Sequence, residues 1–209
     1  LGGLDNWPPA RVDRPAYRWR GGMTIPVELH LRETASGDEL LKEPVTEITK
    51  LETPVFSEKD IPLKEGSWAK TFSGNELSSS RISLSGDAPG PSVVTLSLGN
   101  DAGEHLDITY DEIRHRLTID RTQADEKDFQ ATSPRMHTVG LADDVKGCHL
   151  TVYYDRSVVE VFADEGRYLT TDLVFQQHPY DRLRVSERSD QGKGGPRRLG
   201  ISAIRSVWR

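Results

Sequence analysis

Cysteine is nearly absent from this 209-residue sequence, which contains only Cys148. A single thiol excludes an internal disulfide framework and any metal site built from several thiolates. Apolar runs long enough to span a membrane are also missing from the sequence. The chain opens on Leu1 without a methionine or a charged stretch followed by an apolar one. We therefore expect any signal segment to have been removed or to lie in an absent portion.

Basic residues are outnumbered by acidic ones, 27 Lys and Arg against 33 Asp and Glu, which gives a formal net charge of −6. Such a charge disfavours nucleic acid and anionic membrane surfaces as partners and is compatible with a neutral ligand. Four arginines lie between Arg11 and Arg20, but Asp13 and prolines interrupt them, and we interpret this stretch as a packed connector. The length fits one large domain, or one domain plus a fragment.

Apolar side chains recur at every second position in many short segments, which is the spacing of one face of a β-strand. The turn clusters 99–103 and 163–166 separate some of these segments. The pattern predicts an all-β protein with two packed antiparallel sheets, a β-sandwich of the jelly-roll or lectin-like kind. The segments are Val27-Leu29-Leu31, Ile82-Leu84, Val94-Leu96-Leu98, Leu106-Ile108-Tyr110, Leu117-Ile119, Leu150-Val152-Tyr154, Leu169-Thr171-Leu173, Leu183-Val185 and Leu199-Ile201-Ala203.

One segment has the features of a helix. Pro44 suits a first helical turn, and Val45, Ile48 and Leu51 then share a face, which predicts a short linker helix. Residues 188–198, rich in Gly, Ser, Asp and basic residues, predict a long exposed loop before a final strand that ends at Trp208.

Metal, cofactor and nucleophile motifs are missing from the sequence. The six histidines show no H-E-x-x-H spacing, and no second cysteine accompanies them, so we expect neither a metal site nor a cofactor. Several serines lie near acids, but the G-x-S-x-G elbow of serine hydrolases is absent. The residue patterns alone therefore give no catalytic site.

Two segments carry a resemblance to a known family. Residues 155–166 read D-R-S-V-V-E-V-F-A-D-E-G, and residues 19–29 read W-R-G-G-M-T-I-P-V-E-L. The first closely resembles the D-R-S-x-V-E-V-F-x-x-x-G hairpin of the C-terminal domain of glycoside hydrolase family 32. The second is similar to the segment that links that family's propeller to its sandwich. The resemblance, with further landmarks at Arg121 and at Ser206-Val207-Trp208, covers nearly the whole chain.

The resemblance implies a five-bladed propeller followed by a β-sandwich, as in invertases, levanases, inulinases and related fructosyltransferases. The family's W-M/L-N-D-P-N-G, R-D-P and E-C motifs, which hold its catalytic carboxylates, do not occur here. We therefore expect residues 1–24 to be a C-terminal fragment of the propeller, residues 25–53 a linker with the first strand and the short helix, and residues 54–209 the sandwich. No residue of this chain is expected to be catalytic.

The implied function belongs to the full enzyme, which would cleave or transfer β-D-fructofuranosyl units of sucrose, levan or inulin by a retaining two-carboxylate mechanism. The implied partners are the enzyme's own propeller and, through it, the fructan or sucrose substrate. An extracellular location is favoured over a cytoplasmic one. Within this chain, Asn6 and Trp7 resemble an Asn-Trp pair at the family's pocket wall, where an indole face covers the apolar side of a fructosyl ring. We weigh this equally with a buried indole that contacts no ligand.

Asp155 and Glu160 flank the first strand of the family-like hairpin. Retaining glycosidases need two carboxyl groups about 5 Å apart. We expect five residues of extended chain to place Asp155 and Glu160 roughly 16 Å apart and on opposite faces. We interpret Asp155 and Arg156 as shaping a turn, and Glu160 as hydrogen-bonded on the sheet surface. Asp164 and Glu165 are interpreted as turn residues.

The alternative function is an independent carbohydrate-binding module, because lectins share the sandwich architecture and a fold does not fix a function. That alternative requires exposed aromatic side chains as a sugar platform. The candidates are Trp68, Tyr153, Tyr168 and Tyr180, and their burial in a core or an interface would remove it.

Overall fold

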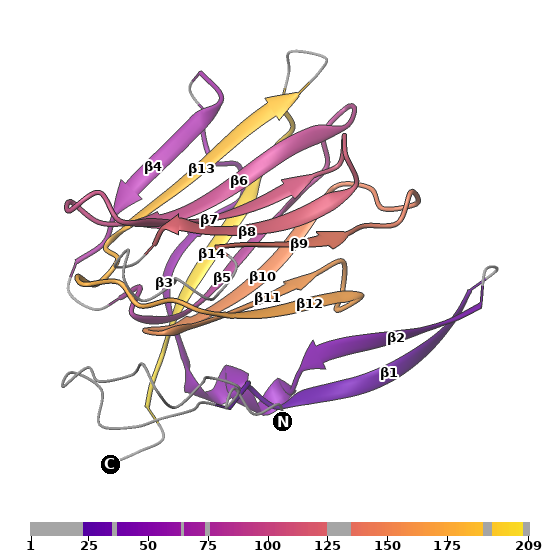
Figure 1. Cartoon of the computed structure of the whole chain (residues 1–209), viewed down its shortest axis with the longest axis horizontal. Coiled ribbons are helices and arrows are strands. Elements are labelled where there is room, and N and C mark those ends of the chain that lie inside the picture. Colours follow the sequence, from indigo (N-terminus) through magenta and orange to yellow (C-terminus); the bar gives the residue numbers. More distant parts are fainter. Residues whose placement is uncertain are drawn as a thin grey trace.

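The computed structural model describes residues 23–34, 37–63, 65–73, 76–124, 135–189 and 194–206. Two antiparallel six-stranded sheets lie face to face, and a separate two-stranded hairpin projects from one side of them (Figure 1). The predicted β-sandwich is therefore confirmed. Within the described ranges, no helix is long and apolar enough to cross a membrane.

The two sheets are built from strands that are neighbours in space but often distant in sequence. The first sheet has the order β12 (Tyr168–Leu173), β11 (Val158–Ala163), β10 (Cys148–Asp155), β5 (Ser79–Gly86), β14 (Arg198–Ile204) and β3 (Glu52–Glu58). The second has the order β4 (Ser67–Thr71), β13 (Arg182–Ser189), β6 (Ser92–Gly99), β7 (His105–Asp111), β8 (Arg116–Gln123) and β9 (Met136–Gly140).

The core lies between the facing sheets and is formed by the alternating apolar residues. In β6 every second residue is buried, with Val94, Leu96 and Leu98 wholly inaccessible to solvent. The opposite face of the core includes Val152 and Val161 from the first sheet. Each fully buried aliphatic side chain contributes about 1.5–3 kcal/mol, so this interior accounts for the stability of the sandwich.

Two of the predicted apolar segments do not face the core. On β12 the buried residues are Thr170 and Asp172, so Leu169 and Leu173 lie on the outer face of the first sheet. Asp172 is stabilised in the interior by Arg121, whose Nε lies 3.6 Å from the carboxylate, and by the ring of His137. On this edge strand, an inward position is therefore occupied by Asp172, which pairs with Arg121 of the opposite sheet.

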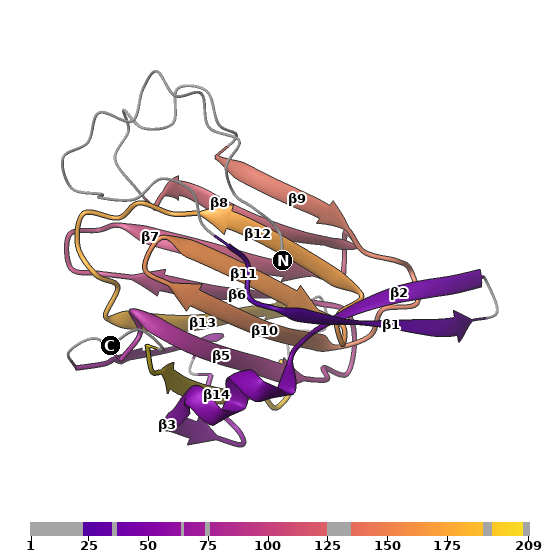
Figure 2. The same ribbon diagram turned by 90° about the horizontal axis from the view of Figure 1, so that it is seen from below.

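The second exception is the segment that begins at Val27, which forms the hairpin β1 (Val27–Thr34) and β2 (Gly37–Pro44) rather than a sandwich strand. A 3-10 helix, η2 (Thr46–Leu51), follows it and lies beside β14 and β3 (Figure 2). The predicted linker helix is thus present, but Pro44 ends β2 and does not start the helix. The i, i+3, i+6 spacing of Val45, Ile48 and Leu51 matches the three-residue turn of a 3-10 helix.

The stretch 188–198 is not wholly an exposed loop, because Arg197 is completely buried. Its guanidinium donates to Glu187 Oε1 at 2.5 Å, to Ser92 Oγ at 3.0 Å and to the carbonyl of Gly86. A buried charge needs such a full set of partners. The last described strand ends at Ile204, and Trp208 lies outside the described residues.

Candidate docking surface around the β11–β12 turn

The predicted site residues Asn6 and Trp7 lie outside the described residues, so their role stays a prediction. No cluster of three or more metal-binding side chains occurs in the described part of the chain. The candidate site therefore lies around the family-like hairpin, residues 155–166, which runs from the end of β10 through β11 to the β11–β12 turn.

Asp155 and Glu160 lie on two neighbouring strands, which corrects the prediction of one extended strand. The chain reverses at Arg156 and Ser157, and Tyr153, not Asp155, pairs directly with Glu160. Asp155 and Glu160 are therefore diagonal neighbours on the same face, with Cα atoms about 7–8 Å apart by ordinary sheet geometry. The predicted turn at Asp155 and Arg156 is confirmed by the positive φ of 51° at Arg156, but it reverses the chain between the two acids, so the predicted extended separation is wrong.

These two carboxyl groups still do not form a catalytic pair. Asp155 is exposed, whereas Glu160 is 3% exposed and its Oε1 accepts a hydrogen bond of 2.8 Å from the backbone N–H of Ile25. Neither residue lines either of the two open hollows of the surface. An acid that protonates a leaving group must reach a bound substrate, and Glu160 faces protein.

Glu160 is instead a contact between the sandwich and the segment before β1, which we call the junction segment (residues 23–26). Burial raises the pKa of the Glu160 carboxyl to about 7, and the hydrogen bond from Ile25 lowers it by less. The second oxygen, Oε2, is buried and has no hydrogen-bond partner among the described residues. The sequence prediction of a hydrogen-bonded Glu160 is confirmed, but the group is buried rather than at the surface.

The turn between β11 and β12 is formed by three consecutive residues with positive φ, as predicted for Asp164 and Glu165. Their φ angles are 52° at Asp164, 56° at Glu165 and 82° at Gly166. The hydroxyl of Tyr110, from the opposite sheet, donates a 2.7 Å hydrogen bond to Asp164. Burial raises the pKa of the Asp164 carboxyl, and the Tyr110 hydrogen bond opposes that rise.

Gly166 is the point where β2 crosses the sandwich. The N–H of Lys42 donates to the carbonyl of Gly166 at 2.9 Å, and a Cβ on Gly166 would lie only 2.3 Å from the carbonyl oxygen of Lys42. Since real Cβ contacts below 3.0 Å essentially do not occur, no side chain fits there. The glycine of the D-R-S-V-V-E-V-F-A-D-E-G sequence thus has a packing role that sequence alone does not reveal.

The next residue, Arg167, forms ion pairs that also attach β2 to the β11–β12 turn. Its guanidinium lies 2.5 Å from Glu39 of β2 and 2.7 Å from Asp144 in the β9–β10 loop. The hydrogen bond from Arg167 lowers the pKa of Asp144. Arg32 of β1 lies 2.7 Å from Glu39, so one carboxylate joins both hairpin strands to the turn.

The two faces of the β1–β2 hairpin therefore carry different kinds of side chain. Arg32, Glu39 and the buried Leu41 face the sandwich. The opposite face carries Leu29, Leu31 and Leu40, which are 62%, 68% and 47% exposed. Leu31 and Leu40 are direct cross-strand partners, so their side chains form one continuous apolar surface. The hairpin is held by its polar face and presents its apolar face outward.

The aromatic residues proposed for a sugar platform are not available for one. Tyr153 and Tyr180 are 5% and 1% exposed. Trp68 and Tyr168 are partly buried and pack against the core. The burial of these four side chains therefore counts against a carbohydrate-binding module built on them.

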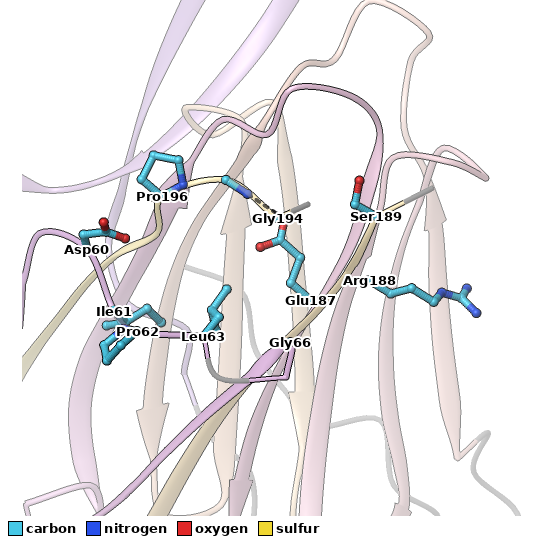
Figure 3. Close-up of a pocket in the computed structure, with 11 residues that line it drawn as sticks. Asp60, Ile61, Pro62, Leu63, Gly66, Glu187, Arg188, Ser189, Gly194 and Pro196 are labelled. Carbon is cyan, nitrogen blue, oxygen red and sulfur yellow. Dashed lines mark hydrogen bonds between the residues drawn. The ribbon is translucent and has the colours of Figure 1, made fainter. Parts of the chain in front are cut away.

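Two hollows formed by described residues lack the features of an active site. The first lies beside the buried Glu187, between the 60–63 segment and the chain around Gly194 and Pro196 (Figure 3). Its one deep charge, Glu187, is already neutralised by Arg197. The second lies between β2 and the outer face of β5, β10 and β11, and its lining includes Ser83, Ser85 and Thr151.

In its described part, the chain is a two-sheet sandwich without a catalytic cleft, and it carries a hairpin whose apolar face points outward. Residues 44–199 match the family model described as the C-terminal domain of glycosyl hydrolases family 32. The chain therefore belongs to this family, in its C-terminal domain.

Relatives of known function are consistent with this assignment. The chain is 26% identical over 214 residues to an extracellular exo-inulinase of Aspergillus awamori, with 100% of this chain and 39% of the relative aligned. It is 24% identical over 211 residues to a levanase of Bacillus subtilis, with 100% and 31% aligned. It thus spans less than two fifths of either relative.

Solved structures show the same fold. The crystal structure of exo-inulinase from Aspergillus awamori superimposes with a TM-score of 0.78 at 25% identity, over 94% of this chain and 38% of that one. A fructofuranosidase from Schwanniomyces occidentalis superimposes with a TM-score of 0.68 at 14% identity, over 92% and 42%.

Proposed function

We propose that this chain is the stabilising C-terminal part of a secreted β-fructosidase. The full polypeptide would cleave or transfer β-D-fructofuranosyl units of sucrose, levan or inulin, using two carboxylates that lie in its catalytic propeller. Three findings support the proposal: the family match, the extracellular inulinase among the relatives, and the share of those relatives that this chain leaves uncovered.

The observation that carries the stabilising role is the apolar face of the hairpin. Leu29, Leu31 and Leu40 form a surface that a polar network turns away from the sandwich. Exposed apolar side chains are costly in water, and clustered ones mark contact surfaces. The proposed occupant is the catalytic propeller, because relatives of this chain contain more than half of their length outside the aligned region. We retain the proposed division into residues 1–24, 25–53 and 54–209, in which the hairpin falls at the junction.

The first experiment asks whether this chain has activity by itself. The purified chain, incubated with sucrose, levan or inulin, should release no fructose above a buffer control. Release that survives repurification, and that follows the protein through gel filtration, would contradict the assignment of catalysis to the preceding domain.

The second experiment tests docking in the full polypeptide encoded with its upstream sequence. Leu31→Lys places a charge within the apolar face, and Met136→Lys places the same charge at a 53% exposed residue on β9 of the second sheet. We expect Leu31→Lys alone to lower the temperature at which fructose-releasing activity is lost. Equal effects of the two variants, or no effect of either, would overturn the docking role.

A further inference from the structure

The contact between Glu160 and the junction segment joins parts of the chain that are 135 residues apart in sequence. The acceptor is a buried carboxyl with one oxygen bonded to the N–H of Ile25 and the other oxygen buried without a partner among the described residues. An ionised carboxylate is stable in a protein interior only when several donors satisfy it. Among the described residues, only one donor reaches Glu160, so the closed contact suits the protonated acid better than the carboxylate.

The groups around Glu160 do not supply the missing charge compensation. Tyr153 stands opposite it on β10, and Thr171 stands opposite it on β12. The guanidinium of Arg81, one strand further away on β5, is engaged 2.8 Å from the carboxylate of Glu52 on β3. Asp155, the diagonal neighbour on β10, carries a negative charge and gives no compensation.

The remaining element against Glu160 is the hairpin end of the chain. The junction segment, 23–26, contains no ionisable side chain, and the next acid, Glu28, is exposed and lies 3.4 Å from His30. Among the causes that shift the titration of Glu160, burial is the largest, and no charged neighbour appears. Protonation of this one carboxyl is therefore decisive for the contact.

We propose that the Glu160–Ile25 contact is a pH-sensitive joint: it holds the junction segment on the sandwich when Glu160 is protonated and opens more often when Glu160 is ionised. Opening moves the carboxylate into water, where a charge is well solvated. The β1–β2 hairpin begins directly after the junction segment, so the joint controls how firmly the base of the hairpin is attached. That this base leads to a catalytic domain rests on the proposed function, whereas the joint itself does not.

The joint is tested by amide hydrogen exchange of Ile25 in the full 209-residue chain. Because the closed form has a pKa of about 7 and an opened, solvated glutamate has one near 4.3, opening becomes more frequent as the pH rises between these values. We expect the protection factor of Ile25, corrected for intrinsic exchange, to fall at least tenfold from pH 5 to pH 8. The amide of Leu84, within the central strand β5, should keep its protection.

Two variants separate the joint from general effects of pH. Glu160→Gln keeps an oxygen that can accept from Ile25 but does not titrate, so the protection of Ile25 should no longer depend on pH. Glu28→Gln removes a nearby exposed acid and should leave the dependence unchanged. The same tenfold fall in Glu160→Gln, or no fall in the unmodified chain, would overturn the proposal.

A measurement without any substitution covers the case in which Glu160→Gln does not fold. The side-chain carboxyl carbon of Glu160, followed by NMR in the unmodified chain, should titrate with a midpoint near 7, and the amide shift of Ile25 should follow the same curve. A midpoint near the ordinary value of glutamate would contradict the proposed joint even if the chain proved inactive as expected. Fructose release would contradict only the proposed function.

Discussion

Replacing Gly166 by alanine should weaken the attachment of the hairpin more than any other glycine substitution with a comparable backbone angle. Gly166 has a φ of 82°, and Gly103, in the β6–β7 turn, has a φ of 85°. An L-residue in this left-handed region costs about 1–2 kcal/mol. A new Cβ at Gly103 meets nothing within 4 Å, whereas one at Gly166 lies 2.3 Å from the carbonyl oxygen of Lys42. The two variants therefore share the backbone cost and differ in the clash.

The extra cost at Gly166 follows from what the clash displaces. To make room, β2 must lift away, which breaks the 2.9 Å hydrogen bond from Lys42 to Gly166 and separates Glu39 from Arg167. A neutral hydrogen bond contributes about 0.5–1.5 kcal/mol, and a partly exposed ion pair at most about 1 kcal/mol. We expect Gly103→Ala to lose about 1 kcal/mol and Gly166→Ala about 2–4 kcal/mol.

The assay is urea unfolding of the two variants and the unmodified chain, followed by limited proteolysis. Gly166→Ala should also gain cleavage sites between residues 23 and 52, since a lifted hairpin exposes its backbone. Equal losses of stability in the two variants, with no new cleavage in the hairpin, would refute the role of Gly166 as the crossing point of β2.

Three further predictions concern buried polar groups. Arg197→Met leaves the Glu187 carboxylate buried without its cation and should cost about 3–5 kcal/mol in urea unfolding, whereas adding Glu187→Met should recover part of that loss. Tyr110→Phe removes the donor to Asp164 and should cost about 1–3 kcal/mol; it should also raise the Asp164 pKa further, which NMR titration would detect. Finally, because folding raises the pKa of Glu160 to about 7, the folded chain binds more protons than the unfolded chain between about pH 4.3 and 7. The free energy of unfolding should therefore fall by about 1–3 kcal/mol as the pH rises through that window, and should fall less in Glu160→Gln.

The fold was predictable from the sequence because alternation of apolar residues directly encodes which strand faces are buried. Val94, Leu96 and Leu98 all proved fully buried. The apolar alternation did not predict the buried face of β12. There Leu169 and Leu173 lie outward, and the inward positions are occupied by Thr170 and the ion-paired Asp172. Periodicity reports the spacing of apolar residues and not which face they occupy.

The docking surface was less predictable, because its residues act through contacts between distant segments. The sequence identified the stretch 155–166 as characteristic of a family, but it gave no reason for Gly166, whose neighbour is Lys42, or for Glu160, whose partner is Ile25. The turn at Asp155 and Arg156 was predicted, but the separation of Asp155 from Glu160 was predicted as if the chain stayed extended between them.

The contacts of residues 155–166 show how the acids of this stretch are used in the described structure. Val159 and Val161 belong to the core, and Glu160, which lies between them, contacts the junction segment. The buried carboxyl groups of this stretch are used in internal contacts: Glu160 accepts from the backbone N–H of Ile25, and Asp164 accepts from the hydroxyl of Tyr110. A general acid must instead be free to exchange a proton with a substrate. The pH response proposed for Glu160 is therefore a change in how firmly the junction segment is joined to the sandwich.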